Sequence, residues 1–202
     1  MIKRHFYLTA ADIAPIEKGT NMPKIIENLR QRLMDEAFEE IKRDGYAAMT
    51  IRSVAKAVGV GTGTIYNYFS SKEALVASFM LEEWKESMKR VEERAGVSEN
   101  LSDVLAAVYA EIRGFLGKFS AVVSDEEAEK TFRNAIGSYH KILRGQIAGV
   151  IRRFVSDDFE AKFIAEAMIT WSVEGVEFEI LRDVITRRGV NNVELRRPQD
   201  SR

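Results

Sequence analysis

Two short helical patterns separated by a glycine-containing turn lie between residues 50 and 75 of this chain. Gly59 stands between them, where the end of a helix favours a residue that adopts positive φ easily. Ile65 restarts the helical period after the turn. This order predicts a helix-turn-helix, a unit whose second helix presents its N-terminal turn to the major groove of DNA. The first pattern places three apolar residues on one face: Val54, Ala55 and Val58.

A longer apolar pattern upstream predicts one more helix for the same domain. Apolar residues recur at helical spacing over residues 26–41, and Gly45 follows as a candidate C-terminal cap. Pro23 suits the first turn of this helix. We therefore expect a three-helix head over residues 22–72, with residues 1–21 as a flexible extension outside it.

The segment from Tyr46 to Lys72 carries a local excess of positive charge. It holds three cationic and no acidic side chains, a charge of +3, in a chain whose net charge is −1. Its hydroxyl and amide groups could bond phosphate oxygens or base edges. Three scattered cations are a weak electrostatic footprint by themselves, and the polar surface of any small helical hairpin would also explain them.

The order and spacing of residues resemble the DNA-binding domain of the TetR family of transcriptional regulators over about residues 25–81. The matching positions are Thr50, Val54-Ala55, Gly59-Val60, Gly63-Thr64-Ile65-Tyr66-Asn67-Tyr68-Phe69 and Lys72. The resemblance implies that Thr50, as the N-cap of the helix that follows it, and Lys72, at the start of a later helix, contact phosphates on either side of the groove. It implies base contacts from Arg52, Thr62, Gly63 and Tyr66, and backbone contacts from Thr64, Asn67 and Tyr68.

Two residues at the start of the second helix depart from that family's pattern. Gly61 stands where a Ser commonly caps the helix, and Thr62 stands where a longer polar or basic side chain is common. Gly caps a helix at a cost of roughly a few tenths of a kcal/mol relative to Ser, so we still expect the helix to form. Because Thr62 makes few bidentate base contacts, discrimination should depend more on Arg52, ring contacts and DNA shape.

The signature also contains residues expected in the core. Ile65 and Phe69 fall on the side that faces the other helices of the head, which predicts burial. Tyr66 is compatible with packing and with DNA contact, because its ring is apolar and its hydroxyl is polar.

The remainder of the chain, residues 73–202, has helical periodicity and no alternation long enough for a strand. Ser70 and Glu73 form a candidate capping box for a helix that runs to about Arg94. The expected protein is therefore all-α, and the resemblance implies that this helical body binds an effector and forms the dimer. Three further helices are expected over about residues 101–119, 132–154 and 159–185.

The expected helix over residues 159–185 has two adjacent apolar faces. Such a helix usually packs on its own domain with one face and on another subunit with the other, which predicts a homodimer. In the resembled family the last two helices form the dimer bundle. Here the segment after Gly189 is too short and polar for a full final helix, so we expect a dimer surface built differently.

The resemblance also implies a small, often hydrophobic effector inside the helical body. Aromatic and flexible apolar side chains could line its pocket, and His140 could orient a polar group of the ligand. For each candidate the alternative is an ordinary core or surface position. The candidates are Phe115, Phe119, Phe132, Tyr139, His140, Met168, Trp171 and Phe178.

Composition argues against several other classes. The chain has no cysteine, and His5 and His140 lack the spacing of a zinc site, so we expect no metal and no cofactor. No run approaches the ~18 apolar residues of a membrane span, which favours a cytoplasmic location without membrane contact. We find no nucleophile with an adjacent base and no phosphate loop, so an enzyme is not expected.

The helix-turn-helix and the family resemblance together predict a DNA-binding transcriptional regulator, a ligand-released repressor that binds a palindromic double-stranded operator as a dimer. The alternative is a helical DNA-binding or interaction protein without a small-molecule effector, controlled by a protein partner. A closed apolar cavity in the body would favour the first, and a solid core the second.

Overall fold

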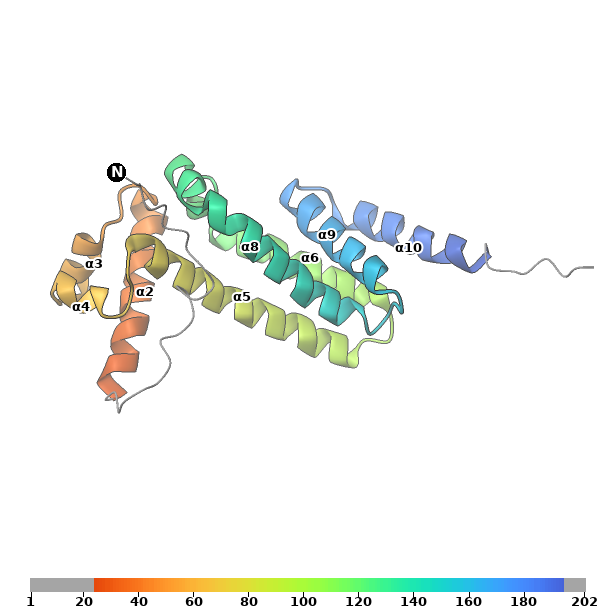
Figure 1. Ribbon diagram of the computed structural model, residues 1–202, viewed down its shortest axis with the longest axis horizontal. Helices are drawn as coiled ribbons and strands as arrows, with labels where there is room; N and C mark the ends of the chain where they lie inside the picture. The colour runs from red at the N-terminus through yellow and green to blue at the C-terminus, as the bar shows by residue number, and fades with distance from the viewer. Residues whose placement is uncertain (1–23, 195–202) are drawn as a thin grey trace, which may run out of the picture. The chain divides into compact units, whose positions relative to one another are not determined.

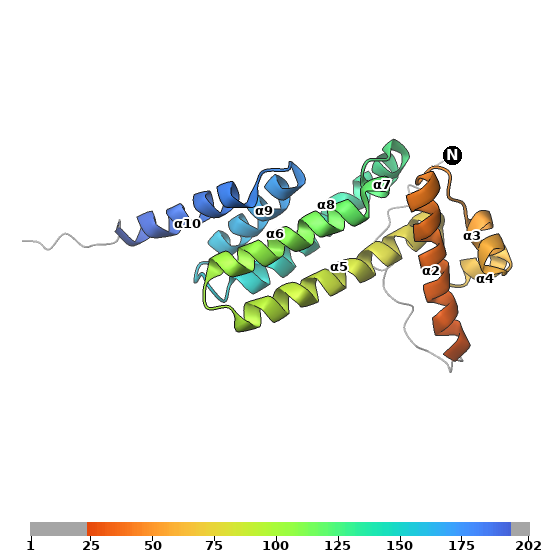
Figure 2. The ribbon, with the colours of Figure 1, turned by 180° about the vertical axis from the view of Figure 1, so that it is seen from behind.

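The computed structural model describes residues 24–194, with side chains described for residues 28–132 and 140–187, and every regular element in that part is an α-helix. Figures 1 and 2 show these helices from two opposite sides. The predicted all-α class is confirmed. In chain order the helices are α2 (Lys24–Asp44), α3 (Ile51–Val58), α4 (Thr62–Tyr66), α5 (Lys72–Val97), α6 (Leu101–Lys118), α7 (Ser120–Val123), α8 (Glu126–Ile151), α9 (Asp158–Val173) and α10 (Phe178–Glu194).

Contacts divide the chain into two compact units. Within the described residues, the first unit comprises residues 24–85 and 117–140, and the second comprises residues 86–116 and 141–194. Helices α5 and α8 therefore supply residues to both units. The predicted boundary of the head, at residue 72, coincides with the first residue of α5, whereas the contact division falls farther along that helix.

The first unit begins with the expected helix, α2, which ends at the expected glycine. Gly45 has φ +88°, and its N–H donates to the Ile41 carbonyl at 2.8 Å. The core of this unit is built from apolar side chains at helical spacing, as the sequence predicts. Those that are completely buried include Leu33, Ala37, Val54, Ile65 and Leu75.

Helices α3 and α4 form the predicted helix-turn-helix. Helix α3 ends at Gly59, whose φ of +81° is the left-handed conformation that favours glycine. The N–H groups of Gly59 and Val60 both donate to the Ala55 carbonyl, at 3.0 and 2.9 Å, which closes the helix end. The chain then enters α4 at Thr62, and this helix has only five residues.

The predicted start of α5 is wrong by one residue. Ser71, not Ser70, caps the helix: its hydroxyl accepts from the Ala74 N–H at 3.2 Å, and its carbonyl accepts from the Leu75 N–H at 3.1 Å. The helix also continues past its predicted end at about Arg94, through Gly96, to Val97. A single glycine inside a helix costs roughly 1 kcal/mol, which is too little to end it by itself.

The single helix predicted over residues 159–185 is also wrong, because the chain breaks at Gly175. This residue has φ +81°, and the Val176 N–H donates to the Trp171 carbonyl at 2.9 Å, as in a left-handed C-terminal cap. Helix α10 then begins at Phe178 and continues through Gly189. The prediction that the chain lacks a full final helix is therefore wrong, because α10 begins well before Gly189.

In the second unit, two side chains of α6 form hydrogen bonds where the chain passes from α9 to α10. The Tyr109 hydroxyl donates to the Val176 carbonyl at 3.0 Å, and the Arg113 guanidinium donates to the Ser172 carbonyl at 3.1 Å. Ser172 lies in the last turn of α9, where carbonyls lack partners within the helix, and Val176 lies in the turn between α9 and α10. No helix within residues 24–194 is long and apolar enough to cross a membrane.

Candidate nucleic-acid interface

Helix α4 exposes the side predicted to contact bases. Thr62, Gly63 and Tyr66 are exposed, and 55% of the Tyr66 surface is accessible to solvent. On the opposite side, Ile65 and the following Phe69 are buried, which confirms their predicted core positions. The two buried side chains thus fix a very short helix with its polar side outward.

The residues predicted to contact the DNA backbone lie on and just after the same helix. Thr64 and Tyr68 are half-buried, and Asn67 is exposed as the residue that ends α4. At the other end, Gly61 precedes α4 in extended conformation and forms no side-chain cap. Uncapped N–H groups at a helix start favour anionic partners.

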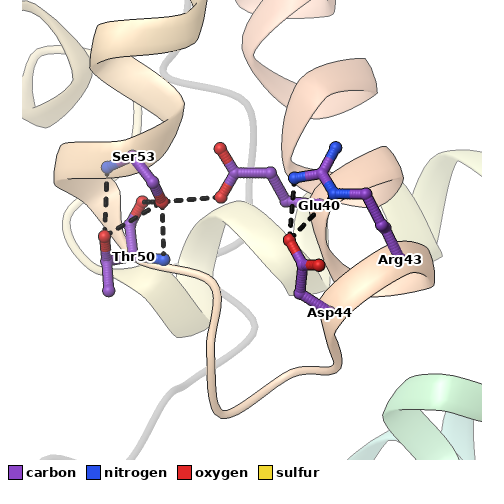
Figure 3. Close-up of polar contacts among 5 residues, drawn as sticks. All are labelled: Glu40, Arg43, Asp44, Thr50 and Ser53. Carbon is purple, nitrogen blue, oxygen red and sulfur yellow. Dashed lines mark hydrogen bonds and ion pairs between the residues drawn. The ribbon is translucent and has the colours of Figure 1, made fainter.

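The start of α3 is held by a hydrogen-bond network that the sequence analysis predicted only in part (Figure 3). Thr50 is the expected N-cap: its hydroxyl accepts from the Ser53 N–H at 3.0 Å, and the Ser53 hydroxyl accepts from the Thr50 N–H at 3.1 Å. The Ser53 hydroxyl in turn donates to a Glu40 carboxylate oxygen at 2.6 Å. This network connects α2 to the first turn of α3.

Glu40 and Ser53 are site residues that sequence reasoning missed. Glu40 is only 5% exposed, yet its charge lies at the N-terminus of α3, where the helix dipole favours an anion. A signal was available, because Glu40 lies three residues after Ala37 and seven after Leu33, on the apolar face of α2. Beside this network, Arg43 and Asp44 form a surface pair at 2.7 Å, and Asp44 raises the pKa of the Arg43 guanidinium (Figure 3).

The three cationic side chains of residues 46–72 have different environments. Arg52, in the first turn of α3, and Lys56, in its last, are exposed and form no ion pair with any residue that the structure describes. Lys72 is half-buried at the start of α5. Its ammonium donates to the Tyr46 carbonyl at 2.6 Å and lies 4.0 Å from the centroid of the Tyr46 ring.

The aromatic candidates for an effector pocket are divided between the two units. In the first unit, Phe119 is buried, with its ring centroid 5.4 Å from that of Phe38, and it also contacts Phe79. Phe132 is half-buried and places its ring against Tyr46. These two candidates therefore belong to separate aromatic contacts.

The other candidates also have separate environments. His140 is half-buried and has an interaction partner, whereas Tyr139 lies outside the residues whose side chains are described. In the second unit, Met168 is completely buried, Phe115 is half-buried, and Phe178 packs against Tyr109. Trp171 is 50% exposed. The effector pocket remains a prediction.

The first unit contains a hollow of about 410 Å³ that is partly open to solvent. It is lined by Phe38, Ile41 and Lys42 of α2 and by residues 117–122. Of the residues predicted to line an effector pocket, Phe119 lines this hollow. Across the described part of the chain, no three His, Cys, Asp or Glu side chains are grouped as a metal site would require.

Comparison with known proteins places the head in a described family. The family model "Bacterial regulatory proteins, tetR family" matches residues 33–79. The chain is 24% identical over 165 residues to the fatty acid metabolism regulator protein of Bacillus subtilis (strain 168), which covers 80% of this chain and 84% of the relative. It is 26% identical over 151 residues to the HTH-type transcriptional repressor DhaR of Mycobacterium sp. (strain GP1), with coverages of 67% and 76%.

A solved structure extends the comparison to the fold. The TetR family repressor AlkX from Dietzia sp. strain DQ12-45-1b superposes with a TM-score of 0.55 at 15% sequence identity. The superposition covers 84% of this chain and 97% of that structure. The likeness therefore includes the helices that follow the region matched by the family model.

Proposed function

This chain belongs to the TetR family of bacterial regulatory proteins, and we propose that it represses transcription by binding a palindromic double-stranded operator as a homodimer that a small hydrophobic effector releases. The observation that supports this best is the exposed polar side of α4, which two buried side chains, Ile65 and Phe69, hold in place. Paired copies of α4 would enter successive major grooves. We propose that the protein has no enzymatic activity. We also propose a cytoplasmic location, because the operator DNA would lie there.

For the DNA complex we propose a division between base and phosphate contacts. Exposed residues of α3 and α4 would contact bases, namely Arg52, Thr62, Gly63 and Tyr66. Tyr66 presents an aromatic ring that suits a thymine methyl group. Residues at the edges of the motif would contact phosphates and so fix the register, namely Thr50, Thr64, Asn67, Tyr68 and Lys72.

For the dimer we propose an interface formed by α9 and α10, which pack on each other in the second unit. Large apolar side chains of both helices are at least half exposed, and such patches on a protein surface mark interaction sites. A two-fold dimer would bury the same patch on both copies. The side chains are Trp171, Val173, Ile180 and Val184.

For the effector we propose a small hydrophobic molecule bound among the aromatic side chains after α5. The relative from Bacillus subtilis is named for fatty acid metabolism, which agrees with an apolar ligand. Control by a protein partner is the competing proposal. Movement of α5, which supplies residues to both units, would transmit ligand binding to the head.

The first test is binding of the purified protein to DNA from its own upstream region, titrated against salt, with unrelated DNA as the control. Much tighter binding to the upstream DNA is the expected result. Equal, salt-sensitive binding to both DNAs would contradict the proposed sequence-specific repressor. The same preparation tests the dimer, because Ile180→Asp with Val184→Asp should give a monomer in analytical ultracentrifugation.

A further inference from the structure

Tyr46 holds the Lys72 side chain through two different groups. The Lys72 ammonium donates a hydrogen bond to the Tyr46 carbonyl at 2.6 Å. The same ammonium lies 4.0 Å from the centroid of the Tyr46 ring, well within the range of a cation–π interaction. The tyrosine is itself completely buried, so its position is fixed by the core and not by the lysine.

This arrangement leaves the ammonium with bonding capacity. A lysine ammonium has three N–H donors, and the Tyr46 carbonyl uses one of them. Lys72 forms no ion pair with any residue in the described part of the chain, so no carboxylate occupies its remaining donors. A DNA phosphate could therefore bind a lysine that is already held in place.

Holding a lysine before DNA arrives has an energetic consequence. A free lysine side chain has up to roughly 2 kcal/mol of rotamer entropy to lose when it is ordered. In this protein part of that entropy is lost on folding, because the ring and the carbonyl restrict the ammonium. The phosphate contact then requires less ordering at the moment of binding.

The Tyr46 ring also contacts α8. Its centroid lies 5.9 Å from that of Phe132, and the two rings are inclined at 64°, as in an edge-to-face pair. The Tyr46 hydroxyl is buried and makes no hydrogen bond with a described residue. Burial, with a smaller contribution from the charge of Glu73, raises the pKa of this hydroxyl, so the ring stays neutral beneath the ammonium.

We propose that Tyr46 is a positioning residue for DNA binding, which orients the Lys72 ammonium toward a DNA phosphate. Through the contact of Tyr46 with Phe132, this orientation also depends on the position of α8. The inference rests on the proposed function, since it requires that Lys72 contacts DNA. Tyr46 itself is buried and touches no DNA in this proposal. It acts only through the lysine.

The test compares two substitutions of Tyr46 in the full-length protein. Tyr46→Leu removes the aromatic face, whereas Tyr46→Phe keeps the face and removes only the unpartnered hydroxyl. We expect Tyr46→Leu to lose on the order of tenfold in DNA affinity per dimer, and Tyr46→Phe to retain the affinity of the parent. Thermal unfolding monitors whether each variant is folded.

The dependence of affinity on salt separates positioning from general damage to the head. Each phosphate contact contributes about 0.9 to the slope of log affinity against log salt, so Lys72→Met should reduce the slope by roughly 2 per dimer. Tyr46→Leu should reduce the slope in the same direction when Lys72 is present, and should add nothing in the Lys72→Met background. Additive losses in the double variant would overturn the proposal.

Nuclear magnetic resonance tests the contact without DNA. The ε-methylene protons of Lys72 should be shifted upfield by the Tyr46 ring in the parent and in Tyr46→Phe, and should lose that shift in Tyr46→Leu. An unshifted lysine in the folded parent would overturn the proposal. Phe132→Leu should give a smaller change in the same signal and a smaller loss of affinity, and that loss should also vanish in the Lys72→Met background.

Failure of the proposed function would look different. If the parent binds unrelated DNA as tightly as upstream DNA, the sequence-specific repressor is contradicted, while the slopes on either DNA still test Tyr46. If the parent prefers its upstream DNA but Tyr46→Leu keeps the parent's affinity and slope, the repressor stands and the positioning role is wrong. If the parent binds no DNA, both are contradicted.

Discussion

The two helices of the helix-turn-helix are stabilised in different ways. Helix α3 is closed at both ends by its own sequence, with a reciprocal cap at Thr50 and a left-handed glycine at Gly59. Helix α4 begins at a glycine without a side-chain cap and has five residues, fewer than an isolated helix needs. It depends on Ile65 and Phe69, which anchor it in the core. Local bonds therefore determine α3, whereas tertiary packing determines α4, whose polar side is left available for DNA.

The largest effect should come from removing the anchor of α4. Ile65→Ala deletes most of a completely buried side chain, and such substitutions cost about 2–5 kcal/mol. We expect a free energy of unfolding lower by about 3 kcal/mol for the head, measured by urea denaturation, and loss of DNA binding through the displaced α4.

Val54→Ala is the matched control for this anchor, because Val54 is equally buried but lies on α3. It should cost less, both because fewer atoms are removed and because the caps of α3 remain. DNA affinity should then fall only as far as the fraction of folded protein falls. Equal loss of DNA binding in both variants at a temperature where both are folded would contradict the difference proposed between the two helices.

A smaller effect should follow from changing the end of α3. Gly59→Ala places a Cβ at φ +81°, where an L-residue costs about 1–2 kcal/mol, although no atom lies within 4 Å of the new Cβ. The expected loss of stability is therefore due to backbone conformation and not to a clash. Gly61→Ala is the control, because Gly61 has φ −75° and needs no special conformation. A cost at residue 59 no larger than at residue 61 would contradict this account.

The contrast between local and tertiary stabilisation also explains which features could be predicted from the sequence. Gly45, Gly59 and Thr50 were assigned correctly, because a turn or a cap depends on the residue itself and its close neighbours. The break at Gly175 was missed, because apolar residues recur at helical spacing on both sides of it. Val176, the residue whose N–H closes that helix end, is itself apolar and gave no signal of a turn.

The candidate site also contains some features that could be predicted from the sequence and others that could not. The exposed side of α4 could be predicted, because helical period alone separates Tyr66 from Ile65. The partners that hold the site could not. Glu40 meets Ser53 across 13 residues, and Tyr46 meets Lys72 across 26. A sequence without structure gives no means of pairing such residues, because the turn between them decides their distance.

The next effect, on DNA binding, should distinguish the roles of the two residues that form the α3 cap. Thr50→Ala and Ser53→Ala each remove one half of the reciprocal cap, which should cost about 1 kcal/mol of stability. Ser53→Ala should cost more than Thr50→Ala, because it also removes the hydroxyl that donates to the buried Glu40 carboxylate. Only Thr50 is proposed to contact a phosphate. Thr50→Ala should therefore also lose several-fold in DNA affinity, roughly the 0.5–1.5 kcal/mol of one hydrogen bond per head. Fluorescence anisotropy on operator DNA measures this, and equal affinities of the two folded variants would remove Thr50 from the interface.

The smallest effect, and the sharpest comparison between the two helices, comes from giving α4 the cap that α3 has. Gly61→Ser supplies a hydroxyl at an extended N-cap position, and the new Cβ meets only the Thr64 hydroxyl, at 4.0 Å. Stability should rise by roughly a few tenths of a kcal/mol. If the uncapped N–H groups of α4 serve to bind a phosphate, the same substitution should weaken DNA binding, because the serine oxygen occupies a donor that the phosphate would use. Gly61→Ala separates the two effects, since it adds the Cβ without an acceptor. A gain in stability with unchanged affinity would mean that α4 reads DNA through its side chains alone.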